Sequence, residues 1–275
     1  MRGRGWQVSV GLVLLAATLL AQGRMGRFRG MSTNPGNHWS RYEYEMQDPV
    51  DDPPNALAPG EFVFGRLRYR SNRDGRAYAR WGIDANKGDR LFLWHLTRLT
   101  RLHTRPIEQI VDIDDDDMFN WPFLFAVSPG DWVLNPGQAE RLRKYFARGG
   151  FLMVDDFHNE AEWAQFMRGI LAIEPKARAL EIDEKDALFH LVYDLDERIR
   201  VPGANVVNGD GIERGGVDPH WRVIVDDDNR VLVAVCFNMD VGDGWEFADD
   251  PEYPEKFSAQ AIRLGVNYVL YAMTH

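Results

Sequence analysis

One stretch of the sequence decides the fold: Gly149-Gly150-Phe151-Leu152-Met153-Val154-Asp155-Asp156-Phe157-His158-Asn159. A short apolar run between a glycine pair and acidic residues is typical of a buried strand. Two carboxylates and an imidazole, those of Asp155, Asp156 and His158, stand where that strand ends. Ligands in open α/β sheets gather at the carboxyl ends of strands, so we expect a functional site here.

Helix signals stand on both sides of this strand. Asn135 and Pro136 are typical of a helix start, and Gly149 is a favoured residue just past a helix end. Asn159 and Glu162 match a capping box at the start of the following helix. The order strand, helix, strand, helix predicts a right-handed parallel unit whose helices pack on the sheet.

Further elements are predicted along the rest of the chain. The predicted strands cover residues 62–70, 107–113 and 123–127, and a C-terminal hairpin pairs residues 221–225 with 231–237. The predicted helices cover residues 89–102, with Asp89 as N-cap, and residues 136–148, 159–172 and 254–273. Together they predict a three-layer α/β fold with a mostly parallel sheet flanked by helices.

The first 60 residues differ in kind from the rest. Two arginines precede an uncharged apolar run over residues 8–20, and small residues follow it up to Gly23, as in an N-terminal signal peptide. Three arginines beyond the run oppose export, so an uncleaved anchor is the second alternative, and a later start at Met25 or Met31 is the third. We predict residues 1–23 as signal peptide or N-terminal anchor, 24–60 as an extended linker, and 61–275 as the α/β domain. The domain is then periplasmic or extracellular, or membrane-anchored.

The charge balance and the single cysteine narrow the function classes. The formal net charge is -10 at pH 7, whereas a nucleic-acid binder needs clustered Lys and Arg on one face, so that class is excluded. Cys236 is the only cysteine, so an intrachain disulfide and a four-thiolate zinc site are excluded as well. The sequence also lacks the serine-hydrolase, P-loop and Rossmann motifs.

The first candidate site is the strand end with Asp155, Asp156 and His158. These residues can bind a divalent cation or act as an acid/base pair. Successive strand residues face opposite ways, so at most one of the two carboxylates is expected over the sheet edge. In the alternative, structural interpretation, the carboxylates accept hydrogen bonds from helix N-termini and the imidazole packs beneath a loop.

The second candidate site follows the strand that holds Cys236. Asn238, Asp240 and Asp243 offer hard oxygen ligands, and the glycines between them allow the backbone to turn around an ion. A structural turn stabilised by Asn and Asp side chains is the alternative. A divalent cation is therefore the one cofactor that the residues suggest, and its identity stays open.

Other charged residues are weaker candidates. Arg70 belongs to a stripe of arginines that can hold an anionic ligand or pair with the acidic loops, formed by Arg66, Arg68, Arg70, Arg73, Arg76 and Arg80. His220 is a candidate ligand-binding residue, although an isolated histidine is more often structural. The run Asp114–Asp117 is typical of a solvated loop.

Several of these segments together resemble the bacterial DUF4159 proteins. The resemblance is carried by residues 123–130, 145–158, 189–190 and 238–243, and it covers roughly residues 62–275. DUF4159 proteins are similar to the class I glutamine amidotransferase-like superfamily, so the resemblance implies a flavodoxin-like fold.

The resemblance also implies that the nucleophile of that superfamily is missing. In the amidotransferase-like fold, a strand ending in a Pro-Gly loop leads through a helix to a second strand, and the turn after it carries a nucleophilic cysteine. Ser128-Pro129-Gly130 corresponds to the first loop, and residues 154–158, which include no cysteine, correspond to the turn. Glutamine hydrolysis by that route is not expected.

Three functional hypotheses follow. The leading one is an exported domain that binds a small-molecule or protein partner of the cell envelope at the Asp155, Asp156 and His158 edge. The second is a metal-assisted hydrolase that uses these residues with Asp240 or Asp243. The third is a structural subunit of a cell-envelope complex. Contact with a membrane is expected only through the N-terminal segment, if that segment stays uncleaved.

Overall fold

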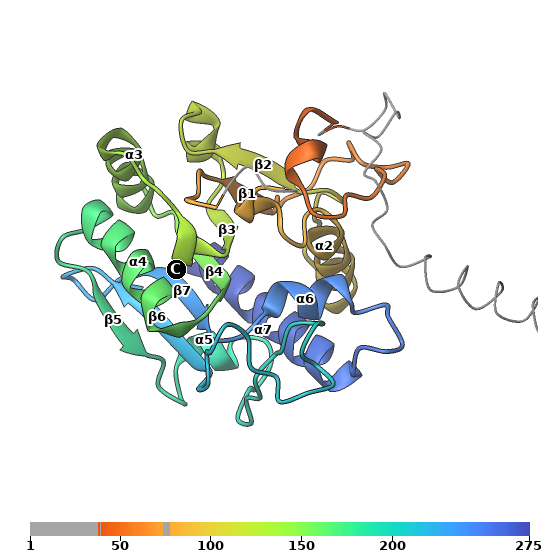
Figure 1. Ribbon diagram of the computed structural model, residues 1–275. Coiled ribbons are helices and arrows are strands. Elements are labelled where there is room, and N and C mark those ends of the chain that lie inside the picture. The colour runs from red at the N-terminus through yellow and green to blue at the C-terminus, as the bar shows by residue number, and fades with distance from the viewer. Residues whose placement is uncertain (1–37, 39, 74–77) are drawn as a thin grey trace, which may run out of the picture. The chain divides into compact units, whose positions relative to one another are not determined.

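The computed structural model describes residues 38, 40–73 and 78–275, and the predicted signal or anchor segment lies outside the described residues. One seven-stranded sheet has the strand order β2-β1-β3-β4-β7-β6-β5 (Figure 1). Its strands are β1 (Gly65–Arg68), β2 (Gln109–Asp112), β3 (Phe123–Val127), β4 (Phe151–Phe157), β5 (Arg178–Glu181), β6 (His220–Val225) and β7 (Val231–Phe237).

The sheet is mostly parallel, as predicted. Strands β2, β1, β3, β4 and β7 run parallel to their neighbours. Strands β6 and β5 extend the sheet antiparallel beyond β7, and β6 with β7 is the predicted hairpin. Strand β4, which lies within the Gly149–Asn159 stretch, runs between β3 and β7 and is buried along its whole length. The apolar run Phe151–Val154 is typical of a strand covered on both faces, and the two buried carboxylates follow it.

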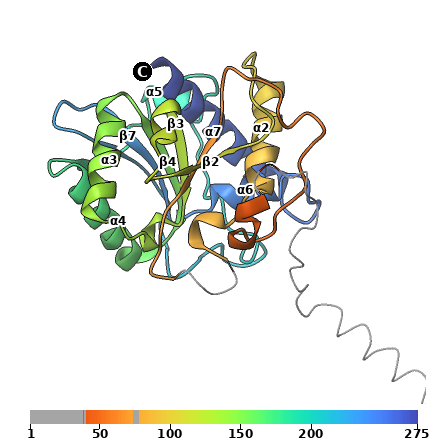
Figure 2. The same cartoon turned by 90° about the horizontal axis from the view of Figure 1, so that it is seen from above.

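Helices cover both faces of the sheet, which confirms the three-layer prediction. Helices α3 and α4 lie on one face, and α2 and α7 lie on the other (Figure 2). The α-helices are α2 (Lys87–Leu99), α3 (Pro136–Ala147), α4 (Asn159–Ile173), α5 (Ala187–His190), α6 (Val241–Glu246) and α7 (Glu255–Thr274). Short 3-10 helices are η2 (Ser40–Glu45), η3 (Arg80–Gly82), η4 (Asp116–Asn120) and η5 (Pro129–Asp131). Among the described helices, none has the length and apolar character needed to cross a bilayer.

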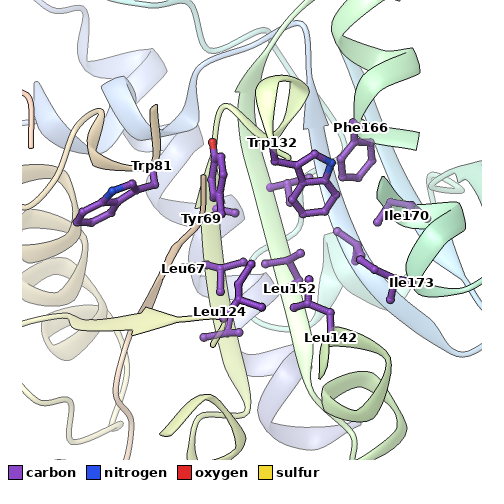
Figure 3. Close-up of a cluster of buried hydrophobic side chains, with 14 of the residues drawn as sticks. Leu67, Tyr69, Trp81, Leu124, Trp132, Leu142, Leu152, Phe166, Ile170 and Ile173 are labelled. Carbon is purple, nitrogen blue, oxygen red and sulfur yellow. The ribbon is translucent and has the colours of Figure 1, made fainter. Parts of the chain in front are cut away.

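Each face of the sheet has its own apolar core. Beneath α3 and α4, Trp132 stacks on Phe166 with ring centroids 5.4 Å apart, beside Leu152 of β4 (Figure 3). On the other face, Phe92 of α2 stacks on Trp245 at 4.4 Å. Buried aromatic rings contribute large apolar areas, so the two layers of helices are fixed independently on the sheet.

Strand β1 and helix α2 differ from their predictions, and one buried ion pair joins the two elements. The strand is shorter than predicted. Its Arg66 is buried and forms a bidentate ion pair with the carboxylate of Asp89, with N–O distances of 2.9 and 2.6 Å. Asp89 is therefore no N-cap, and α2 begins at Lys87. An Asp that caps a helix and an Asp that is buried in an ion pair cannot be distinguished from the sequence, because each is a single Asp before an apolar stripe.

The start of α4 carries the predicted capping groups in a shifted arrangement. The side chain of Asn159 accepts hydrogen bonds from the backbone N–H groups of Ala161 and Glu162. Glu162 accepts from the N–H of His158 at 2.8 Å, one residue earlier than a standard capping box requires. The N–H of Asn159 is thereby left for Asn238 of the neighbouring loop, at 2.9 Å.

One strand, β5, and two short α-helices, α5 and α6, were not predicted. Strand β5 is an edge strand with largely exposed residues, so it lacks the alternation that marks a half-buried strand. Helix α6 has only six residues and occupies the stretch expected as a turn. The described part of the predicted linker packs on the domain, because Met46 is buried and Glu45 pairs with Arg68 at 2.8 Å.

Candidate functional site

Strand β4 ends in a β-bulge that changes the direction of its two carboxylates. Val154 pairs with Val235 and Phe157 with Phe237, so β4 holds one residue more than β7 over this interval. Asp156 has a φ of 51°, in the left-handed region that Asp tolerates better than most residues. The bulge breaks the regular alternation, and Asp155 and Asp156 both contact groups beyond the sheet edge.

Asp156 is held by three side chains. Its Oδ2 accepts from Ser128 Oγ at 2.6 Å, and its Oδ1 lies 2.8 Å from Nη2 of Arg214 and 3.3 Å from Nε2 of His158. Burial opposes ionisation, but the Arg214 charge and the His158 contact lower the pKa of Asp156 below its ordinary value. Asp156 is therefore a carboxylate whose two oxygens are both engaged.

His158 connects Asp156 to a loop carboxylate that was not among the predicted site residues. Its Nε2 lies 3.7 Å from Oε2 of Glu213. Ligand atoms of Asp156, His158 and Glu213 all lie within 4.8 Å of one another, and we call these three residues the edge trio. Burial and the charge of Asp156 raise the pKa of Glu213.

The second predicted cluster lies against the first. Asp240 caps α6 by accepting from the N–H of Asp243 at 2.8 Å, and Asp243 accepts from the N–H of Ala204 at 2.6 Å. The N–H of Gly242 donates to Asp155 at 2.7 Å. The first turn of α6 therefore joins the two clusters that the sequence placed about 80 residues apart along the chain.

Two further carboxylates complete the site, and the sequence reasoning missed both. Ligand atoms of Asp84, Asp243 and Glu246 lie within 4.8 Å of one another, as do those of Glu213, Asp240 and Asp243. Glu246 follows Asp243 by three residues, a spacing that would have placed both on one face had the short helix been recognised. No periodic pattern marks Asp84. We call these five residues the carboxylate cluster.

The charges of the carboxylate cluster are poorly balanced. Burial, and then repulsion by neighbouring carboxylates, raises the pKa of Asp243 to about 6 and that of Glu246 to about 7. Burial also raises the pKa values of Asp84 and Asp240 well above the ordinary range. Arg66 and Lys87 act on the cluster but are engaged elsewhere, because Arg66 bonds Asp89 and Lys87 pairs with Asp249 at 3.0 Å. Nη1 of Arg214 lies 3.7 Å from Oε2 of Glu213, but Arg214 also pairs with Asp156 and Glu162.

Three buried polar atoms at this edge lack a hydrogen-bond partner among the residues that the structure describes. They are Oδ2 of Asp84, Oδ1 of Asp155 and Nδ1 of His158, and each of these residues is at most 2% exposed. Buried polar atoms without partners are uncommon in proteins and costly to stability. The Asp84 oxygen belongs to the carboxylate cluster, where a cation would satisfy it.

The remaining predicted site residues have structural contacts. Asn238 accepts from Asn159 and donates to the carbonyl of Asp218 at 2.7 Å, so it ties two loops together. His220 begins β6 and lies 2.8 Å from Glu181. Arg70 is exposed after β1, and its carbonyl accepts from the N–H of Val133.

The arginine stripe pairs mostly with acidic residues. The ion pairs are Arg66 with Asp89, Arg68 with Glu45 and Asp112, Arg73 with Asp131 and Glu162, and Arg80 with Asp131. These ion pairs support the structural interpretation of the stripe, in which its arginines pair with acidic residues. Arg76 lies outside the described residues. Cys236 is buried, and burial raises the pKa of its thiol well above the ordinary value, as expected of an inert core thiol.

The comparison with protein families assigns this site to a known domain. A family model described as a domain of unknown function, DUF4159, matches residues 63–273. The chain belongs to the DUF4159 family. No curated protein matches the chain. The matched DUF4159 region contains both the edge trio and the carboxylate cluster, so the site is part of the domain and not of the N-terminal segment.

Proposed function

We propose that this DUF4159 domain binds a divalent cation in the carboxylate cluster and uses it to bind a ligand or protein partner. The observation that carries the proposal is Oδ2 of Asp84, a buried carboxylate oxygen without a hydrogen-bond partner in the described part of the chain. It belongs to a group of three carboxylates within 4.8 Å of one another. A cation would replace their mutual repulsion by attraction.

The chemistry of the cluster indicates the class of cation. All five members offer carboxylate oxygens, and hard cations such as Mg²⁺, Ca²⁺ and Mn²⁺ prefer such ligands. An imidazole, which suits Zn²⁺ better, is present only in the edge trio. Carboxylates must lose their protons to coordinate a cation, so the raised pKa values of Asp243 and Glu246 predict tighter binding above pH 7 than below it.

Cation binding is expected to stabilise the purified domain. A cation at about 100 times its dissociation constant adds about 2.7 kcal/mol to the free energy of unfolding. We expect the melting temperature of the EDTA-treated protein to rise on addition of Mg²⁺, Ca²⁺ or Mn²⁺. Asp243→Asn removes a central ligand and should abolish the rise.

The matched control is Asp116→Asn, because Asp116 lies in the acidic run of η4 and is exposed. This variant should respond to the cation as the wild type does. An unchanged melting temperature of the wild-type protein with all three cations, together with no metal in elemental analysis, would overturn the proposal.

The second candidate function is a metal-assisted hydrolase, and the edge trio supports it. Asp156 has a left-handed backbone at the β-bulge near the end of β4, a type of strain that gathers at active sites. His158 beside it can accept a proton from an attacking water. Cation-dependent hydrolysis of model esters or phosphoesters, lost in His158→Asn and retained in His220→Asn, would favour this function over binding alone.

We further propose that the domain is exported and acts with a partner of the cell envelope, on an amidotransferase-like fold that has lost its nucleophile. The support is the apolar run over residues 8–20 and the carboxylate at the turn where that fold keeps a cysteine. N-terminal sequencing of the protein from its native host tests the export. An intact Met1 in a cytosolic fraction would contradict it.

A further inference from the structure

A long loop covers the carboxylate cluster. Between α5 and β6, residues 191–219 form no helix or strand, and in Figure 1 this teal segment passes close to α6. Loops longer than about 12–15 residues without secondary structure are uncommon in compact domains and are often functional. Here the N–H of Ala204 donates to Asp243, and the N–H of Asp240 donates to the carbonyl of Val201 at 2.8 Å. We call residues 203–216 the closing segment.

Arg214 attaches the closing segment to the end of β4. Its Nη2 donates to both the carbonyl and Oδ1 of Asp156 at 2.8 Å, and its Nε lies 3.3 Å from Oε1 of Glu162. Its own carbonyl accepts from the Asn159 side chain at 3.0 Å. The backbone of Arg214 has a φ of 44°, which is unfavourable for a long side chain, so these contacts hold it in a conformation it would not adopt alone.

Glu213, the neighbour of Arg214, is the only residue common to the edge trio and the carboxylate cluster among the described residues. Gly203 makes room for it, because a Cβ atom at that position would overlap the Glu213 carboxylate. The location of this carboxylate therefore depends on the path of the closing segment, whereas Asp240 and Asp243 are fixed by α6.

We propose that Arg214 is a positioning residue that anchors the closing segment and thereby brings Glu213 to the cation. This inference rests on the proposed function and concerns the regulation of the same site. Closure of the segment completes the cation site. The bound cation in turn stabilises the closed segment, because coupling between two equilibria is reciprocal. In this arrangement Asp156 is the anchor for Arg214 rather than a ligand. That role agrees with both of its oxygens being engaged.

The test measures closure and cation affinity separately. Hydrogen exchange of residues 203–216 is followed in EDTA, and Mn²⁺ binding is followed by calorimetry. Arg214→Ala should speed the exchange and weaken Mn²⁺ binding roughly ten- to a hundredfold, the usual loss when a group that orients a metal ligand is removed. Glu213→Gln should weaken Mn²⁺ binding as much and leave the exchange in EDTA unchanged, because the closer contacts of Arg214 with Asp156 and Glu162 stay intact.

Two further variants keep the test decisive. Arg214→Ala leaves the buried Asp156 carboxylate without its arginine partner, which can unfold the protein. The double variant Asp156→Asn with Arg214→Ala removes both charges and should still show fast exchange and weak Mn²⁺ binding. Arg168→Ala, an exposed arginine of α4, should match the wild type in both measurements.

The outcomes separate the inference from the proposed function. Fast exchange in the Arg214 variants with wild-type Mn²⁺ affinity would overturn the positioning role and leave the cation site standing. Wild-type exchange of residues 203–216 in the Arg214 variants would also overturn the positioning role. A wild-type protein that binds no Mn²⁺, Mg²⁺ or Ca²⁺ would overturn the proposed function itself.

Discussion

Arg66→Met is expected to cost about 3–5 kcal/mol of the free energy of unfolding, the loss typical when one partner of a buried ion pair is removed. Arg66 is 1% exposed and Asp89 is fully buried, so the variant leaves a carboxylate in the core without its cation. The carbonyls of Trp81 and Ile83, which accept from Arg66 at 3.3 and 3.1 Å, lose their donor as well. Urea denaturation of the wild type and the variant at pH 7 measures the difference.

Two control variants separate the buried charge from other effects. Arg66→Met combined with Asp89→Leu removes both charges and should recover much of the lost stability, because an apolar pair of similar volume often replaces a buried ion pair well. Lys176→Met removes the exposed pair of Lys176 with Asp227 and should leave the denaturation midpoint unchanged. If the Arg66→Met variant were as stable as the wild type, the Arg66–Asp89 pair would not be what holds β1 against α2.

The cation-free domain is expected to lose stability between pH 5 and pH 8. The pKa of Glu246 is raised to about 7 and that of Asp243 to about 6, mainly by burial. The folded protein therefore binds more protons than the unfolded chain in this window, and its stability falls as pH rises through the folded-state pKa values. The raised pKa of Glu246 alone accounts for a loss of about 3 kcal/mol in the free energy of unfolding. Asp156 does not contribute to this slope, because its pKa lies below the ordinary value.

Urea denaturation in EDTA at pH 5, 6, 7 and 8 measures this dependence. Glu246→Gln should flatten the slope, whereas Glu160→Gln, which changes an exposed acid in the first turn of α4, should keep it. Saturating Mn²⁺ should reverse the slope, because cation binding requires the deprotonated carboxylates. A wild-type protein whose stability rises from pH 5 to pH 8 in EDTA would contradict the electrostatic description of the cluster.

The layered fold could be predicted because its signals are local. The apolar run of β4, the Asn135 cap of α3 and the hairpin turn between β6 and β7 each specify an element from neighbouring residues. Parallel strands joined by helices then leave few topologies. The elements that were missed, β5, α5 and α6, have four to six residues, which is too short for a periodic pattern to show.

The sequence by itself determined that Asp156 and His158 stand at a strand end and that Asp240 and Asp243 follow another strand. Only the tertiary structure decided that these residues meet, because the parallel pairing of β4 with β7 brings the two strand ends to one edge. It also decided which other carboxylates join them. Asp84 and Glu213 come from irregular segments. Their positions depend on long-range contacts: Asp84 packs against Gly242, Glu213 packs against Gly203, and the neighbouring Arg214 pairs with Asp156. Local sequence patterns do not predict such contacts.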